Sequence, residues 1–150
     1  METEAKYYVP SDLEFCIGFE YECSRGVKGI PDEHWMKYTF PNVPHIGVDW
    51  GTENPFSIVS RIKFKRVKYL DSKDIESLGF KLIFSDIGIE YWKLGNFELR
   101  TDVDLSAYID SDNLYSIFYN PYGKQYNCMF SGIIKNKSEL KQVLKMIGVQ

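Results

Sequence analysis

Alternation of apolar and polar residues is strictest at residues 13–23, L-E-F-C-I-G-F-E-Y-E-C. Such a period of two is typical of a β-strand with one buried face. The apolar positions are Leu13, Phe15, Ile17, Phe19, Tyr21 and Cys23. The other face carries Glu14, Glu20 and Glu22, with Gly18 leaving a gap between them. We therefore predict a strand over 13–23.

The next segment, residues 24–57, is interrupted repeatedly by Gly and Pro. Pro31 suits the first turn of a helix, and Pro41 marks a point that a helix does not reach. We therefore predict a short helix over 31–38. The remainder of 24–57 is predicted to be a long excursion without regular structure, and such excursions are often functional.

The pattern over residues 60–69 predicts another strand. Ile62 and Phe64 are at even positions and Val67 and Tyr69 at odd positions, so a regular strand would place the two pairs on opposite faces. A bulge near Lys65 and Arg66 would place the four apolar residues on one face. Residues 71–79 then predict a short helix. Asp71 or Ser72 caps it, Ile75 and Leu78 face inward, and Gly79 ends it.

Turn residues separate the apolar runs in the rest of the chain. Gly88, Gly95 and the sequence N-P-Y-G at 120–123 supply turns between antiparallel neighbours. The pattern predicts a meander of hairpins with three or four further strands, formed from the runs at 80–85, 89–94, 97–103, 113–119 and 124–134.

The last segment has the pattern of an amphipathic helix. Asn136 can cap it and Glu139 can reach back in a capping box, while Gly148 ends it. Its apolar stripe follows the helical repeat, with Leu140, Val143, Leu144 and Ile147. The sequence thus predicts one α+β domain over residues 1–150. We expect an antiparallel sheet, this helix packed on it, and one or two short helices.

Composition does not change the predicted fold class, but it excludes some classes of function. Of the 150 residues 44% are hydrophobic and 26% charged, as in ordinary globular proteins, whereas the aromatic share of 16% is high. Aromatic residues favour sheets, and they also line ligand or partner surfaces. The net charge of −3 argues against a general nucleic-acid-binding protein.

Three cysteines, Cys16, Cys23 and Cys128, without a C-x-x-C spacing indicate a reducing compartment. We expect them to be buried structural residues. The N-terminus lacks the pattern of a signal peptide, and no apolar run reaches membrane-spanning length. We therefore expect a cytoplasmic protein.

Catalytic and cofactor motifs are missing from the sequence. His34, His45 and Asp49 do not have the spacing of metal ligands, and neither a nucleophile elbow nor a phosphate-binding glycine motif occurs. Asp86 with Glu98 and Arg100 loosely resembles the carboxylate sites of metal-dependent nucleases. We predict no catalytic, cofactor or metal residue, and keep a metal-dependent nuclease or phosphodiesterase as the alternative.

The basic run R-I-K-F-K-R-V-K places Arg61, Lys63 and Lys65 on one face of the predicted strand. These cations would pair with Glu14, Glu20 and Glu22 across the sheet. Alternatively, they would form an anion site in which Tyr119 or Tyr122 stacks a base.

Large aromatic side chains also lie in the predicted excursion and its short helix. Trp35, Phe40 and Trp50 are candidate anchors for a protein partner, because such residues dominate binding hot spots. A homo-oligomer is compatible with the sequence.

Three segments together resemble a group of small proteins of bacteriophages and prophage-bearing bacteria. They are L-E-F-C-I-G-F-E-Y-E, R-V-K-Y-L-D-S-K-D-I-E-S-L-G-F and the ending I-I-K-N-K-S-E-L-K-Q-V-L-K-M-I-G-V. The resemblance carries over no activity and no functional residue. It implies a protein of the infected bacterial cell that binds and neutralises a host protein or a small anionic, nucleotide-like ligand. A structural or virion-associated role is the further alternative.

Overall fold

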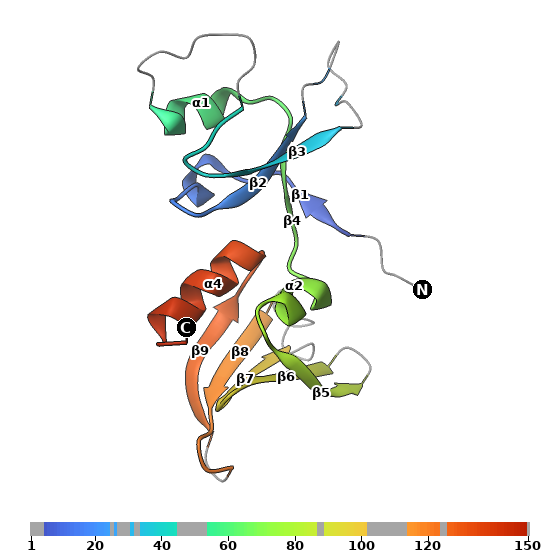
Figure 1. The fold of residues 1–150 in the computed structure, drawn as a ribbon, viewed down its shortest axis with the longest axis vertical. Coiled ribbons are helices and arrows are strands. Elements are labelled where there is room, and N and C mark those ends of the chain that lie inside the picture. The colour runs from blue at the N-terminus through green and yellow to red at the C-terminus, as the bar shows by residue number, and fades with distance from the viewer. Residues whose placement is uncertain are drawn as a thin grey trace. The chain divides into compact units, whose positions relative to one another are not determined.

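The computed structural model describes residues 5–24, 26, 31, 34–44, 54–86, 89–101, 114–123 and 126–149. The chain divides into two compact units, Met1–Tyr69 and Leu70–Gln150. Each unit contains one antiparallel sheet (Figure 1). The predicted α+β class is confirmed. The strands of the chain form two sheets, however, where one sheet was predicted. One domain over residues 1–150 stays a prediction, because the division into units does not test whether each folds alone.

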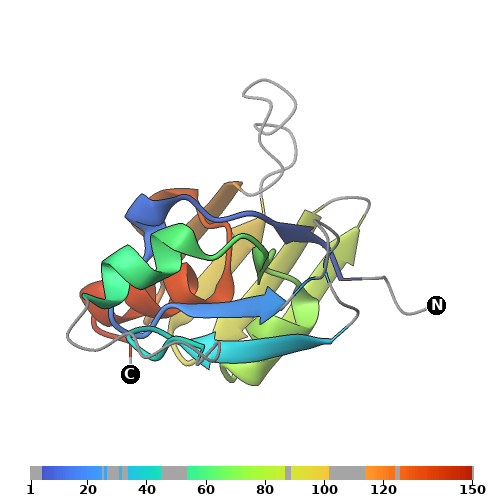
Figure 2. The ribbon, with the colours of Figure 1, turned by 90° about the horizontal axis from the view of Figure 1, so that it is seen from above.

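The sheet of the first unit has the order β1-β4-β2-β3. Its strands are β1 (Tyr7–Tyr8), β2 (Glu20–Ser24), β3 (Trp35–Thr39) and β4 (Lys65–Lys68). Two short helices, η1 (Asp12–Glu14) and α1 (Pro55–Arg61), lie beside it (Figure 2). The core between them is rich in aromatic side chains and includes Phe15, Phe19, Tyr21, Phe40 and Val59.

The second unit is a meander of antiparallel strands, as predicted, but it has five strands where three or four were predicted, in the order β5-β6-β7-β8-β9. Its strands are β5 (Lys81–Asp86), β6 (Ile89–Leu94), β7 (Phe97–Thr101), β8 (Leu114–Tyr119) and β9 (Asn127–Ile133). The helices are α2 (Ser72–Ser77) and α4 (Lys137–Met146). Both helices contribute to the same core, which contains Ile75, Trp92, Leu99, Ile117 and Leu140. They therefore lie on one face of the sheet, which we call the helix face (Figure 1).

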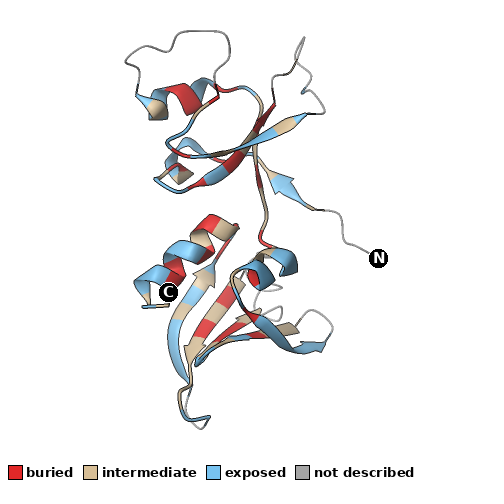
Figure 3. Cartoon of the chain, viewed as in Figure 1, coloured by how far each residue is buried: buried red, intermediate tan, exposed pale blue. Residues whose placement is uncertain are grey.

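Local capping signals place both helices of this unit where they were predicted. The Asn136 side chain accepts a hydrogen bond from the Glu139 amide at 2.9 Å, and Asp71 accepts one from the Asp74 amide at 3.0 Å. The buried residues of α4 face the sheet (Figure 3). Leu140 is fully buried, so the predicted packing of the terminal helix on the sheet is confirmed.

The predicted strand over 13–23 is correct only for its second half. Leu13 lies in η1 and Ile17 in a turn, and they are 97% and 84% exposed. Gly18 has φ +92°, which bends the chain before β2 begins at Glu20. A capping box between Ser11 and Glu14 favours the short helix over an extended strand.

The helix predicted over 31–38 is wrong, because its second half forms β3. Every residue of β3 pairs with β2, from Glu20 opposite Thr39 to Ser24 opposite Trp35. Trp, Tyr and Thr favour strands, and pairing with β2 outweighs the local start signal at Pro31.

Sequence reasoning missed α1, which begins inside the predicted excursion. Asn54 caps it by accepting a hydrogen bond from the Phe56 amide at 2.9 Å, and Pro55 occupies its first position. The excursion residues 45–53 lie outside the described residues. The strand predicted over 60–69 is reduced to β4, because α1 continues through Arg61.

The three cysteines are free thiols, but they differ in exposure. Cys23 is buried as expected, and burial raises the pKa of its thiol to about 12. Cys128 is exposed, so its assignment as a buried structural residue is wrong.

Candidate functional site

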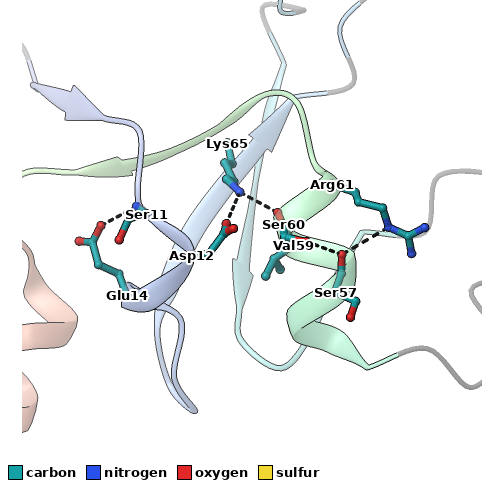
Figure 4. A network of polar contacts seen from close by, with 8 residues as sticks. All are labelled: Ser11, Asp12, Glu14, Ser57, Val59, Ser60, Arg61 and Lys65. Atoms are coloured by element: carbon teal, nitrogen blue, oxygen red, sulfur yellow. Dashed lines mark hydrogen bonds and ion pairs between the residues drawn. The ribbon is translucent and has the colours of Figure 1, made fainter.

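Lys65 is buried in the first unit rather than presented to an anion. Its Nζ donates a hydrogen bond to the Val59 carbonyl at 2.7 Å and lies 3.1 Å from Asp12 Oδ1 (Figure 4). The residue is only 8% exposed, and its ammonium also lies over the Phe15 ring. This lysine therefore joins β4 to α1 and η1.

Arg61 and Lys63 do not share a strand face with Lys65, so the predicted alignment of the three cations is wrong. Anion binding by these residues stays a prediction. Arg61 is the last residue of α1, and its Nε donates to the Ser57 carbonyl at 3.4 Å. Its guanidinium points away from Lys65 (Figure 4). Strand parity does not apply where the chain is helical.

The predicted stacking residues belong to the other unit. Tyr119 lies in β8 with its ring 5.1 Å from the Phe97 ring, and it lines a shallow hollow with Met129 and Ile147. Tyr122 is 87% exposed in the turn after β8. Neither unit therefore contains both the predicted cations and the predicted rings.

The predicted partner anchors have three different outcomes. Phe40 is 2% exposed and packs edge-on against Phe15, so it serves the core and is not available as an anchor. Trp35 is half-buried in β3. Trp50 lies outside the described residues.

An arginine stacked between rings lies on the sheet of the first unit. The Arg66 guanidinium is 3.7 Å from the Tyr7 ring centroid and 4.1 Å from that of Trp35. Its Nη2 pairs with Glu22 Oε1 at 3.1 Å. The expected pairing of strand cations with the acidic residues of 13–23 thus occurs, but through Arg66. Glu14 instead accepts hydrogen bonds from Tyr8 and the Ser11 amide.

The register of the second sheet separates Asp86 from Glu98, the carboxylates of the nuclease alternative. Glu98 is opposite Lys93, which is opposite Lys81 at the start of β5, whereas Asp86 ends β5. The two ends of a six-residue strand lie roughly 16 Å apart. Asp86 and Glu98 are therefore too distant to share a metal ion.

A second arginine–aromatic cluster lies on the face of this sheet opposite the helix face. Cross-strand pairs place two rows of side chains there, Lys81–Lys93–Glu98–Phe118 and Phe84–Tyr91–Arg100–Ser116. Tyr126 joins them through Arg100 and Phe118. We call this surface the ring face, defined by Lys81, Phe84, Tyr91, Lys93, Glu98, Arg100, Phe118 and Tyr126. No helix among the described residues of this unit lies on it.

Arg100 holds the centre of the ring face. Its guanidinium carbon is 4.6 Å from the Tyr91 and Tyr126 ring centroids and 4.7 Å from that of Phe118. Its Nε donates to Glu98 Oε1 at 2.9 Å, which neutralises a carboxylate that is mostly buried. The guanidinium thus orients the surrounding rings and is itself engaged by Glu98.

The outer part of the ring face remains available to a ligand. Phe84 and Tyr126 are 47% and 50% exposed, and Lys81 and Lys93 are exposed. Exposed rings can stack a planar group, and lysine ammonium groups can bind an anion. The arrangement therefore suits a ligand with both features.

Sequence analysis missed the ring face because a bulge hides its pattern. The register shifts between Leu82 and Phe84, so Lys81 and Phe84 share a face despite their odd spacing. The alternation of Tyr91 with Lys93 and of Glu98 with Arg100 was the available signal.

The described residues contain no group of three or more His, Cys, Asp or Glu side chains that could hold a metal ion. His34 is exposed, and His45 and Asp49 lie outside the described residues. Within the same described part of the chain, no helix has the length and apolarity needed to cross a membrane.

Comparison of the chain with family models, curated proteins and solved structures finds no match.

Proposed function

We propose that this chain is a non-enzymatic binding protein whose ring face binds a small anionic, nucleotide-like ligand. The observation that carries the proposal is the placement of exposed rings beside exposed lysines on a face that no described helix of the unit covers. The base would stack on Phe84 and Tyr91, and the phosphate would contact Lys81 and Lys93. Base stacking on an aromatic side chain contributes about 1–3 kcal/mol per base.

Charge favours a short ligand over a long nucleic acid. The ring face has three cations, but Arg100 is paired with Glu98, which leaves two lysines for phosphate. The chain as a whole has net charge −3 and would repel an extended polyanion. Two lysines suit the phosphates of a nucleotide or a very short oligonucleotide.

Sequestration during phage infection is the context that the sequence resemblance suggests for this binding. A bacterial nucleotide signal would be met in the cytoplasm of the infected cell and withdrawn from its receptor. A host protein remains the alternative target, and a flat nucleotide panel would favour it.

Melting temperatures of the protein with a panel of nucleotides, cyclic dinucleotides and short oligonucleotides test the proposal. A ligand present at 100 times its dissociation constant adds about 2.7 kcal/mol to the unfolding free energy. For a chain of this size we expect a rise of roughly 5–10 °C. The rise should decrease with added salt, because it depends on phosphate contacts.

Variants locate the site. Tyr91→Leu/Lys93→Gln should abolish the rise, because it removes one ring and one cation from the ring face. Arg61→Ala/Lys63→Ala and Tyr122→Leu, which alter the site predicted from sequence, should leave it unchanged. Loss of the rise in the Arg61/Lys63 variant, with retention in the Tyr91/Lys93 variant, would overturn the assignment to the ring face.

A further inference from the structure

Strand β5 forms an edge of the second sheet, and apolar side chains are exposed along it. It pairs with β6 and with no other described strand. All six of its residues are exposed (Figure 3), with Leu82, Ile83 and Phe84 at 46%, 53% and 47%. An exposed apolar edge strand offers unpaired backbone groups on which another strand can be added.

The sequence of β5, K-L-I-F-S-D, is complementary to itself when it is read in the antiparallel direction. Lys81 at its start and Asp86 at its end have opposite charges. Lys81 is paired with Lys93 and Asp86 with Ile89, and Lys93 and Ile89 lie two apart from Tyr91 on the ring face. Lys81 and Asp86 therefore both lie on the ring-face side of the sheet. We propose that β5 pairs antiparallel with β5 of a second copy of this chain. The two sheets then continue into each other across a two-fold axis.

The bulge in β5 fixes the register of this pairing. Ile83 is the extra residue between Leu82 and Phe84, so the regular positions are Lys81, Leu82, Phe84, Ser85 and Asp86. Two-fold pairing of those positions places Phe84 opposite Phe84 of the second copy, and Leu82 opposite Ser85. Lys81 then faces Asp86 of the second copy, and each pair lies on one face, as a β-ladder requires.

Charge complementarity selects a second copy as the occupant. Both ends of the junction place Lys81 of one copy opposite Asp86 of the other, so opposite charges face each other twice by symmetry. Exposed ion pairs contribute little affinity, but like charges at the same positions are unfavourable, and this fixes direction and register. The central contact is apolar, from Phe84 of each copy with Ile83 nearby. The interface is small, so we expect a weak, concentration-dependent dimer.

Sedimentation velocity of the full chain over a wide concentration range tests the proposal. Wild type should pass from monomer to dimer. Lys81→Glu places a glutamate opposite Asp86 of the second copy, and Asp86→Lys places two lysines opposite each other. Each single variant should therefore weaken the dimer roughly tenfold or more.

Mixing the two single variants gives the sharpest result. The introduced glutamate of one chain then faces the introduced lysine of the other, while the native Asp86 and Lys81 face each other at the second end. The mixture should form a heterodimer about as readily as wild type dimerises, whereas each variant alone associates roughly tenfold more weakly or worse. The double variant Lys81→Glu/Asp86→Lys should dimerise like wild type again. Ile133→Lys, at the exposed end of the opposite edge strand β9, is the matched control and should dimerise like wild type.

Two outcomes would overturn the proposal. The first is a wild type that remains monomeric at all concentrations. The second is a failure of the mixed variants to associate although each keeps the wild-type melting temperature. Lys81 and Phe84 belong both to the ring face and to this junction. Sedimentation is measured without nucleotide, however, so a chain that stays monomeric refutes the strand pairing and leaves the melting-temperature test of ligand binding to be decided by itself.

Discussion

Arginine side chains occupy similar settings on the two sheets. Arg66 lies between Tyr7 and Trp35 and pairs with Glu22, and Arg100 lies among three rings and pairs with Glu98. A planar guanidinium can stack on a ring and donate to a carboxylate at the same time, whereas a lysine ammonium cannot combine these contacts so well. Lys65, whose ammonium lies over the Phe15 ring, is instead held by the Val59 carbonyl and Asp12.

We expect the buried phenol of Tyr115 to make the unfolding free energy fall at alkaline pH. Burial and, secondarily, nearby carboxylates such as Glu90 raise the pKa of its phenol from 10 to about 12. The folded state therefore favours the neutral phenol. The stabilisation is complete below about pH 10 and is lost as the pH rises towards 12. Between about pH 9 and pH 11 the unfolding free energy of wild type should fall on the order of 1 kcal/mol more than that of Tyr115→Phe.

Urea titrations of both proteins at the two pH values measure this difference. The comparison with Tyr115→Phe cancels the effects of the other titrating groups. Equal losses in the two proteins would show that Tyr115 does not titrate differently in the folded state.

Helix α4 illustrates how an element combines a local signal with a tertiary contact. Its first turn is capped by Asn136, and its apolar stripe joins the core with Trp92 and Ile117 of the sheet. Both the capping and the stripe are visible in the sequence. Strand β3 is the opposite case, because only pairing with β2 makes it a strand.

Truncation of the buried stripe of α4 should destabilise the second unit strongly. Leu140 and Leu144 are 0% and 6% exposed, so Leu140→Ala and Leu144→Ala should each lower the unfolding free energy by about 2–5 kcal/mol. Met146→Ala is the control on the same helix, because Met146 is 74% exposed and its truncation should cost less than about 0.5 kcal/mol. Denaturant melts measure all three, and equal small losses would mean that α4 contributes little to the core.

At the scale of the whole molecule, the two units have separate cores. Phe15, Tyr21 and Phe40 belong to one core, and Trp92, Leu99 and Leu140 belong to the other. The second unit consists of consecutive hairpins between two capped helices, so its contacts are largely between neighbours in sequence. Such a unit has the properties of a domain that folds independently.

A fragment of residues 70–150 should therefore fold alone, contrary to the prediction of one domain. Trp92 is the single tryptophan of this fragment and is 1% exposed in the structure. Its fluorescence should have a blue-shifted maximum in buffer and shift cooperatively to the red in urea. A red-shifted maximum in buffer, without a transition, would instead support one domain over the whole chain.

The sequence by itself determined the elements whose signals are local. Helices α2 and α4 begin at caps and end near glycines, and the meander alternates apolar runs with turn residues, so these features follow from residues a few positions apart.

Tertiary structure decided the rest. Residues 35–39 form a strand because they pair with β2, although Pro31 signals a helix. Arg61 lies in α1, although the alternation around it is typical of a strand. The bulge at Ile83 shifts the register by one residue, which places Phe84 on the same face as Tyr91 and Lys93. Which side chains share a face depends on register, and register is set by strands brought together from different parts of the chain.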